Sequence, residues 1–236
     1  MRNRALRRVS LVGLALIAIA ALAGFRQAER RERPQRFDKQ VRVDFFAGFS
    51  GDRAALDRAM KICDETLREN PKYAEALVWR GSGKLYLAGQ AFQSGDQQKG
   101  MELWQAGLKE MADAVALEPE NVGVLIPRGA VLLIMTRFAP PEVGKPLLQT
   151  GLEDYEKVYE IQKPYFDSLS GHARGELLFG LAEGFVRAGN PDKARQYFEA
   201  LVKVGESSSY LEDAKTWLDT GSLPKKAVTC RGCHAG

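Results

Sequence analysis

The sequence has few residues that bind metals: its 236 residues include 3 cysteines and 2 histidines. Most of them lie together near the end of the chain, as Cys230, Cys233 and His234. A structural zinc site takes four such ligands, which usually come as pairs close in sequence. The other candidates, Cys63 and His172, are far away in the chain and form no second pair. The composition therefore gives little support to a zinc site.

Strand periodicity and catalytic groupings are also missing. No stretch sustains the alternation of apolar and polar residues that a half-buried strand requires. The βαβ pattern that surrounds a redox-active Cys-x-x-Cys pair in thioredoxin-like proteins is thus absent. Acidic pairs such as Glu153-Asp154 and Glu212-Asp213 fall on polar faces of expected helices, and nothing places a base beside a nucleophile. We therefore predict an all-α protein that is not an enzyme.

Basic residues are scarce in the part of the chain that is expected to fold. Four arginines and no acidic residue precede position 24, and residues 24–42 hold seven basic and three acidic residues. Because the whole chain has a net charge of +4, the part from Val43 onward is net negative by four. A nucleic-acid-binding domain requires clustered basic residues on the domain itself, so a nucleic-acid partner is not supported.

The N-terminus combines this positive charge with a charge-free apolar run of 17 residues, 9–25. Such a run is slightly long for the core of a signal peptide and at the short limit for a membrane helix. Ala21-Leu22-Ala23 offers a cleavage site. Residues 1–25 are therefore a signal peptide or a membrane anchor, and 26–49 are expected to form a basic linker.

From Ser50 to Leu218 the sequence alternates helical periodicity with short Gly, Pro, Asn and Asp interruptions. In the first expected helix, apolar residues recur at three- and four-residue steps from Leu56 to Leu67, and Asn70-Pro71 ends it because proline disfavours helical geometry in its predecessor. We expect about eight helices, at 51–69, 73–95, 98–116, 121–137, 141–161, 168–188, 191–204 and 208–219.

Motifs within these helices recur along the chain. One type of motif occurs three times, as Trp79-x-x-Ser82-Gly83-x-x-Tyr86, Leu125-x-x-Arg128-Gly129-x-x-Leu132 and Leu178-x-x-Leu181-Ala182-x-x-Phe185. A second type occurs four times, as Ala59-x-x-x-Cys63, Gly107-x-x-x-Met111, Gly151-x-x-x-Tyr155 and Ala194-x-x-x-Phe198. The two types resemble the signatures of the first and the second helix of a tetratricopeptide repeat. Over residues 50–219 the chain resembles a tetratricopeptide array, although its trailing prolines recur at 48 and 45 residues instead of 34. We expect the small residues Gly83, Gly129 and Ala182 to let two antiparallel helices approach closely, and the aromatic and aliphatic positions to fill the seam between successive hairpins as core. The resemblance implies binding of peptides or partner proteins.

The tail, residues 220–236, ends in Cys230-x-x-Cys233-His234. This pattern resembles the haem-attachment motif of c-type cytochromes, which implies one covalent haem c. Cys230 and Cys233 would form the thioethers and His234 would be the proximal iron ligand. His172 is a possible sixth ligand, with Met60, Met101, Met111 and Met135 as alternatives. A disulfide between Cys230 and Cys233, or free thiols, remains open.

Attachment of c-type haem outside the cytoplasm, which the resemblance implies, agrees with the export signal. We expect an extracytoplasmic, periplasmic-side protein that is anchored in the inner membrane or secreted after cleavage. The leading hypothesis is a monohaem electron-transfer subunit whose helical repeats dock it to redox partner proteins or a membrane redox complex. The alternative is an adaptor without haem.

Overall fold

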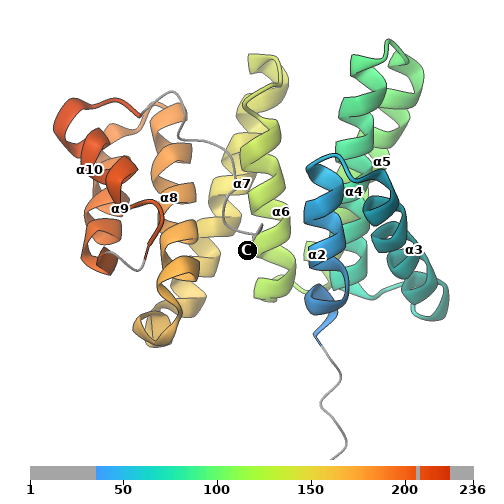
Figure 1. Cartoon of the computed structure of the whole chain (residues 1–236), viewed down its shortest axis with the longest axis horizontal. Helices are drawn as coiled ribbons and strands as arrows, with labels where there is room; N and C mark the ends of the chain where they lie inside the picture. Colours follow the sequence, from blue (N-terminus) through green and yellow to red (C-terminus); the bar gives the residue numbers. More distant parts are fainter. Residues whose placement is uncertain (1–35, 206–207, 224–236) are drawn as a thin grey trace, which may run out of the picture. The chain divides into compact units, whose positions relative to one another are not determined.

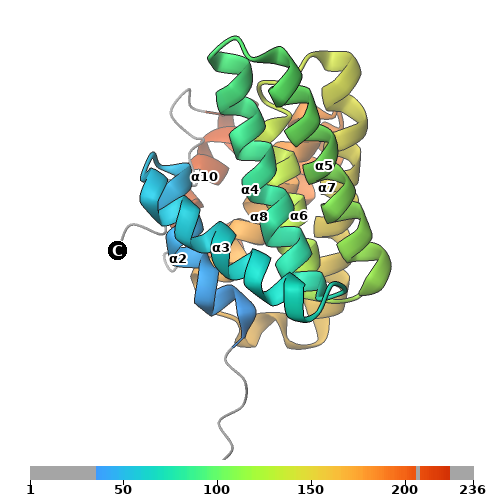
Figure 2. The same ribbon diagram turned by 90° about the vertical axis from the view of Figure 1, so that its right-hand side faces the viewer.

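The structure is a computed structural model that describes residues 36–205 and 208–223. All the regular structure within these ranges is helical (Figures 1 and 2). The helices are α2 (Phe37–Phe49), α3 (Arg53–Glu69), α4 (Ala74–Gln93), α5 (Gln97–Leu117), α6 (Val122–Met135), α7 (Pro141–Gln162), the 3₁₀ helix η1 (Lys163–Ser168), α8 (Gly171–Arg187), α9 (Pro191–Val204) and α10 (Leu211–Thr220). In these two ranges no helix is long and apolar enough to cross a membrane. The apolar run 9–25 lies outside them.

All eight helices expected from the sequence are present, as α3 to α10. Their ends follow local chemistry, because the first backbone N–H groups of a helix need acceptors that the helix itself cannot supply. The side chain of Asp52 accepts a hydrogen bond from the N–H of Ala55 at 3.0 Å, and Asn190 does the same for Lys193 at 3.1 Å. The Asp and Asn residues that interrupt the helical periodicity of the sequence therefore act as helix caps.

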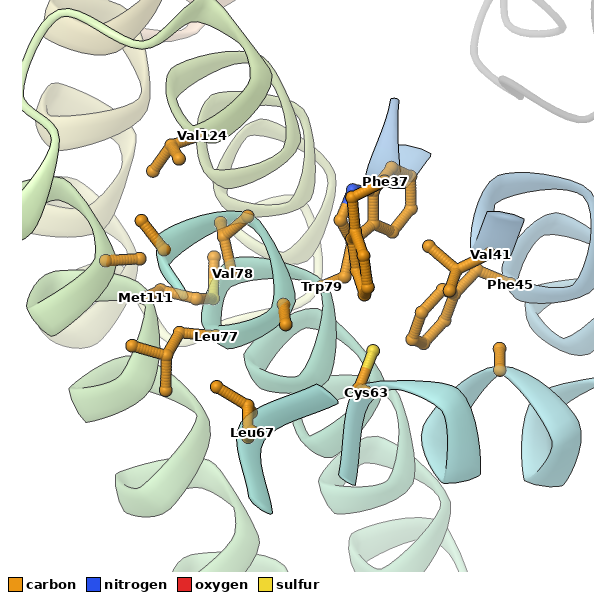
Figure 3. Packing of buried hydrophobic residues seen from close by; sticks show 14 of the residues in the cluster. Phe37, Val41, Phe45, Cys63, Leu67, Leu77, Val78, Trp79, Met111 and Val124 are labelled. Atoms are coloured by element: carbon orange, nitrogen blue, oxygen red, sulfur yellow. The ribbon is translucent and has the colours of Figure 1, made fainter. Parts of the chain in front are cut away.

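Helix α2 corrects the expected linker 26–49, because residues 37–49 are helical and belong to the core. Phe37, Val41 and Phe45 follow one another at four-residue steps and are 2 %, 0 % and 0 % exposed. Figure 3 shows them beside Trp79 of α4 and Cys63 of α3. The helical body therefore begins at Phe37 and not at residue 50.

The helices pair as antiparallel neighbours in chain order. Helix α2 packs on α3, α4 on α5, α6 on α7 and α8 on α9, while α10 packs on α9. The first helix of each hairpin also contacts the first helix of the next, so that α4 lies against α2 and α6, and α8 lies against α6. Figure 1 shows α10, α9, α8, α7 and α6 following one another across the view, with α2 drawn between α6 and the helices α3, α4 and α5.

A pair of glycines sets the close approach within each of the two central hairpins. A Cβ atom added to Gly81 would lie 2.8 Å from the carbonyl oxygen of Gly107, and one added to Gly151 would lie 3.3 Å from that of Gly129. The expected close approach of two helices at Gly129 is confirmed. At Gly83 the expectation is wrong, because this glycine does not face the other helix of its own hairpin. Gly83 faces Met60 and Phe45 of the preceding hairpin instead.

Both central hairpins contain an ion pair of the same kind beside these glycines. Arg80 precedes Gly81 and binds Glu110 of α5, with the Nη2 to Oε1 distance 2.6 Å. Arg128 precedes Gly129 and binds Asp154 of α7 through two contacts of 2.6 Å. Each acid stands three residues after the partner glycine of its hairpin. The two hairpins thus share one construction, an Arg-Gly pair facing a Gly-x-x-acid segment.

The buried apolar residues form two clusters. The first joins α2, α3 and α4 with parts of α5 and α6, and the second joins parts of α6 and α7 with α8, α9 and α10. Trp79, Phe185 and Phe198 are at most 6 % exposed, and Tyr86 packs partly buried against the first cluster. The aromatic residues of the repeat motifs are therefore core residues, as expected.

Candidate functional site

The motif residues Cys230, Cys233 and His234 lie outside the described residues, so the structure places only the point from which the tail departs. Within residues 36–205 and 208–223, no group of three or more His, Cys, Asp or Glu side chains could hold a metal ion. The described body therefore offers no metal cluster of its own, and the candidate site consists of the tail and the helices next to its origin.

The origin of the tail is held firmly by the second hydrophobic cluster. Helix α10 ends at Gly221, whose positive φ of 70° suits glycine and whose N–H donates to the carbonyl of Trp217 at 2.7 Å. The Trp217 ring stacks on Phe198 with the centroids 4.7 Å apart. Leu223 packs partly buried against the same cluster. Cys230 follows Leu223 by seven residues, which span at most about 25 Å when fully extended.

His172 lies in the first turn of α8, after the cap residue Ser170, whose hydroxyl accepts a hydrogen bond from Ala173 N–H at 3.2 Å. Its side chain is 40 % exposed, and its Nε2 atom lies 3.6 Å from a carboxylate oxygen of Glu176. This part of α8 lies close to the loop that precedes α10, because Gly175 packs against Ser208. The imidazole of His172 is thus half-exposed near the elements that carry the tail, but its Nε2 atom is itself buried.

The methionines considered as alternative ligands differ in accessibility. Met111 is 1 % exposed, and Met60 and Met135 pack against the first cluster. Met101 is 49 % exposed on α5. Cys63 is fully buried, and burial raises the pKa of its thiol to about 12. A buried thiol with so high a pKa is not a reactive nucleophile at neutral pH, and Cys63 is a core residue of the first cluster.

The sequence matches no protein-family model, and no curated protein is significantly similar to it. Its structure is similar to that of TTC0263, a TPR (tetratricopeptide repeat) protein from Thermus thermophilus. That similarity covers 78% of this chain and 83% of the other, with a TM-score of 0.51 at 20% sequence identity. The fold is tetratricopeptide-like.

Weaker similarities are found to two further structures. A human IFIT1 dimer with PPP-AAAA matches with a TM-score of 0.33 at 15% identity, over 63% of this chain and 46% of that chain. MamA matches with a TM-score of 0.31 at 15% identity, over 65% of this chain and 91% of that chain.

The tetratricopeptide-like body also contains a buried charge cluster that the sequence motifs did not predict. The Glu183 side chain of α8 is 6 % exposed and lies 2.9 Å from Arg187 and 3.3 Å from Arg137. Arg187 in turn donates to the carbonyl of Leu133 at 2.7 Å and to the hydroxyl of Thr136 at 2.9 Å. Burial lowers the pKa of Arg187. The cluster joins the end of α6 to α8, and the four-residue spacing of Glu183 and Arg187 was its only sequence signal.

Proposed function

We propose that the chain is an extracytoplasmic monohaem c-type cytochrome subunit that transfers electrons to or from a partner protein. The observation that carries this proposal is the motif Cys230-x-x-Cys233-His234, seven residues beyond Leu223. Two thiols and a histidine at this spacing lie on one face of a helical turn, as attachment of one porphyrin requires. The chain supplies the thioether sulfurs and the proximal imidazole, and the haem would supply the redox-active iron.

The short tail limits where such a haem can lie. A macrocycle held at a chain end exposes a large apolar surface, and surfaces of that size are normally covered by protein. Because Cys230 stays within about 25 Å of Leu223, the covering surface belongs to the last helices of the row or to a partner docked there. Helix α10 has ten residues and spans about 15 Å. A tail running back along it is long enough to bring a haem to His172, our candidate for the sixth ligand.

The helical body has the role of a scaffold in this proposal. Tetratricopeptide-like hairpins present extended surfaces to other proteins, so the body would dock the subunit to redox partner proteins or to a membrane redox complex. The apolar run 9–25 supports export and residence at the periplasmic face of the inner membrane, by anchoring or by secretion after cleavage. No enzymatic activity is proposed.

Expression of the full chain together with a cytochrome c maturation system tests the haem proposal. We expect a mass increase of one haem and the absorption spectrum of a c-type cytochrome. The matched control is the variant Cys230→Ser/Cys233→Ser, which keeps the helical body and should lose both signals. An unmodified mass and no haem absorption in the parent chain would overturn the proposal.

The second candidate function is a tetratricopeptide adaptor without haem, and the structural similarity to a TPR protein favours it. In this case Cys230 and Cys233 form a disulfide or stay free. The same double-serine variant separates the two functions in an assay with proteins that copurify with the parent chain. An adaptor keeps its partners after the substitution and shows no haem, whereas the cytochrome loses its redox activity.

A further inference from the structure

Three of the four described hairpins turn by the same construction. In the α2–α3, α4–α5 and α8–α9 turns, a glycine with positive φ is followed directly by Asp or Asn, as Gly51-Asp52, Gly95-Asp96 and Gly189-Asn190. The side chain of that Asp or Asn accepts a hydrogen bond from the backbone N–H three residues ahead and so begins the second helix. A hairpin of this fold therefore needs no apolar side chain in its turn.

The fourth turn, at 136–140 between α6 and α7, departs from this construction. It contains no glycine and leaves the start of α7 without a side-chain cap. Phe138 is 84 % exposed, the highest value among the large apolar side chains of the described residues. Val143 is 39 % exposed, and Pro140 and Pro141 between them are exposed as well. These four residues define the α6–α7 surface, an apolar group that gains nothing from contact with water.

The buried charge cluster of α6 and α8 fixes the backbone that carries this surface. Arg187 donates to the Leu133 carbonyl at 2.7 Å and to the Thr136 hydroxyl at 2.9 Å. Arg137, next to Phe138, lies 3.3 Å from Glu183. A partner therefore binds Phe138 without first having to order a loop. An aromatic side chain held in this way is suited to anchor a protein interface.

The charged residues beside the α6–α7 surface have both signs. Glu142 and Lys145 are exposed near the start of α7. Among the described residues neither of them forms an ion pair, whereas Glu212 and Lys215, at the same spacing in α10, lie 2.8 Å apart. A partner of one strong charge would place a group of like sign against one of them. A second copy of the same surface, turned about a two-fold axis, places an opposite charge against each.

We propose that the α6–α7 surface is a site of self-association, where two copies of the chain pack Phe138 against Phe138 around a two-fold axis. Glu142 of each copy pairs with Lys145 of the other, because an isologous interface uses the same patch on both subunits. The surface is one turn and the start of one helix, which is less than the roughly 800 Å² per partner of a stable interface. The dimer is therefore weak and reversible, and its formation does not require the haem.

Sedimentation equilibrium of the purified full chain without haem, in a density-matched detergent, tests this self-association. We expect the average mass to rise from one copy toward two over about a hundredfold range of protein concentration. Phe138→Ser should raise the dissociation constant at least about tenfold, because it removes the aromatic anchor. Met101→Ser is the matched control, because Met101 is also exposed, at 49 %, but lies on α5. It should leave the dissociation constant unchanged.

Exchange of the two charges tests the two-fold arrangement. Glu142→Lys and Lys145→Glu should each weaken the dimer, because each substitution brings like charges together at both ends of the interface. The double variant Glu142→Lys/Lys145→Glu should restore the parent's dissociation constant, because opposite charges meet again.

A dimer that Phe138→Ser leaves intact, or that Met101→Ser weakens equally, would overturn the proposal. A double charge variant as weak as either single one would also overturn it. So would a parent chain that stays a single copy at every concentration, and Phe138 would then be left to a different protein. The haem test described above is a separate measurement, so either result can fail without the other.

Discussion

Replacing Arg128 with methionine should destabilise the helical body by leaving a buried carboxylate without its partner. The Asp154 side chain is 4 % exposed and accepts two hydrogen bonds of 2.6 Å from the Arg128 guanidinium. Methionine keeps much of the apolar stem but cannot donate these bonds. Removing one partner of a buried ion pair costs about 3–5 kcal/mol. We expect the free energy of unfolding at pH 7 to fall by that amount.

Urea unfolding followed by far-UV circular dichroism measures this loss. For a urea dependence of about 2–3 kcal/mol per molar, a loss of about 4 kcal/mol lowers the midpoint by about 1–2 M. Burial raises the pKa of the Asp154 carboxyl even with Arg128 present, and removal of Arg128 raises it further. A carboxyl whose pKa is higher in the folded state stabilises that state as the pH falls. The deficit of Arg128→Met should therefore shrink from pH 7 toward about pH 5.

The chain offers a matched control for this prediction. Arg58 binds Asp44 with the same two-contact geometry, at 2.7 and 3.1 Å, but its side chain is 59 % exposed. Water screens this pair, so Arg58→Met should leave the midpoint nearly unchanged. The double variant Arg128→Met/Asp154→Leu should recover most of the lost stability, because no buried charge remains. Equal losses for Arg128→Met and Arg58→Met, or a double variant as unstable as Arg128→Met, would refute the reasoning.

Substitutions and modification at single sites test other parts of the structure. Gly81→Ala should lower the melting temperature, because its Cβ atom would lie 2.8 Å from the Gly107 carbonyl oxygen, whereas Gly89→Ala, which meets nothing within 4 Å, should raise stability by about 0.5–1 kcal/mol; shifts of the same sign would contradict this. Cys63, with a thiol pKa of about 12, should resist alkylation at pH 8 in the native protein and react in urea, as peptide mass spectrometry can show. In the haem-loaded protein, His172→Ala should convert a low-spin spectrum to high-spin; an unchanged spectrum places the sixth ligand elsewhere.

The helices and much of the core follow from local rules that the sequence displays. Asp52 and Asn190 cap helices because their side chains accept hydrogen bonds from backbone N–H groups three residues ahead. Trp79 and Phe198 are buried because they recur at helical spacing on apolar faces. These properties depend on neighbours within one or two turns, so the one-dimensional pattern is enough to predict them.

Helix α2 was missed for a specific reason. Its Phe37, Val41 and Phe45 recur every four residues, but they belong to the segment 26–49, whose many basic residues predict a linker. The helix gains its place by burying these three side chains against α3 and α4. That gain depends on a surface formed elsewhere in the chain, which local patterns do not contain.

The partners of the glycines could not be predicted from the local pattern either. Gly81 and Gly83 stand two residues apart on α4, and each allows a close approach, one to Gly107 and the other to Met60. The sequence motif predicts that Gly83 makes the contact within the hairpin, whereas in the structure Gly81 makes it. A spacing identifies small residues on a helix, but not which of two neighbouring helices each one faces.

The all-helical class, the approximate bounds of eight helices and the motif at Cys230 could be recognised from the amino-acid order, because each depends on residues close together in the chain. The place of α2 in the body, the pairing of the glycines and the burial of Asp154 against Arg128 became known from the packed helices alone. These properties arise from contacts between residues tens of positions apart, such as the 26 that separate Arg128 from Asp154. Such contacts exist only once the hairpins have packed in their row.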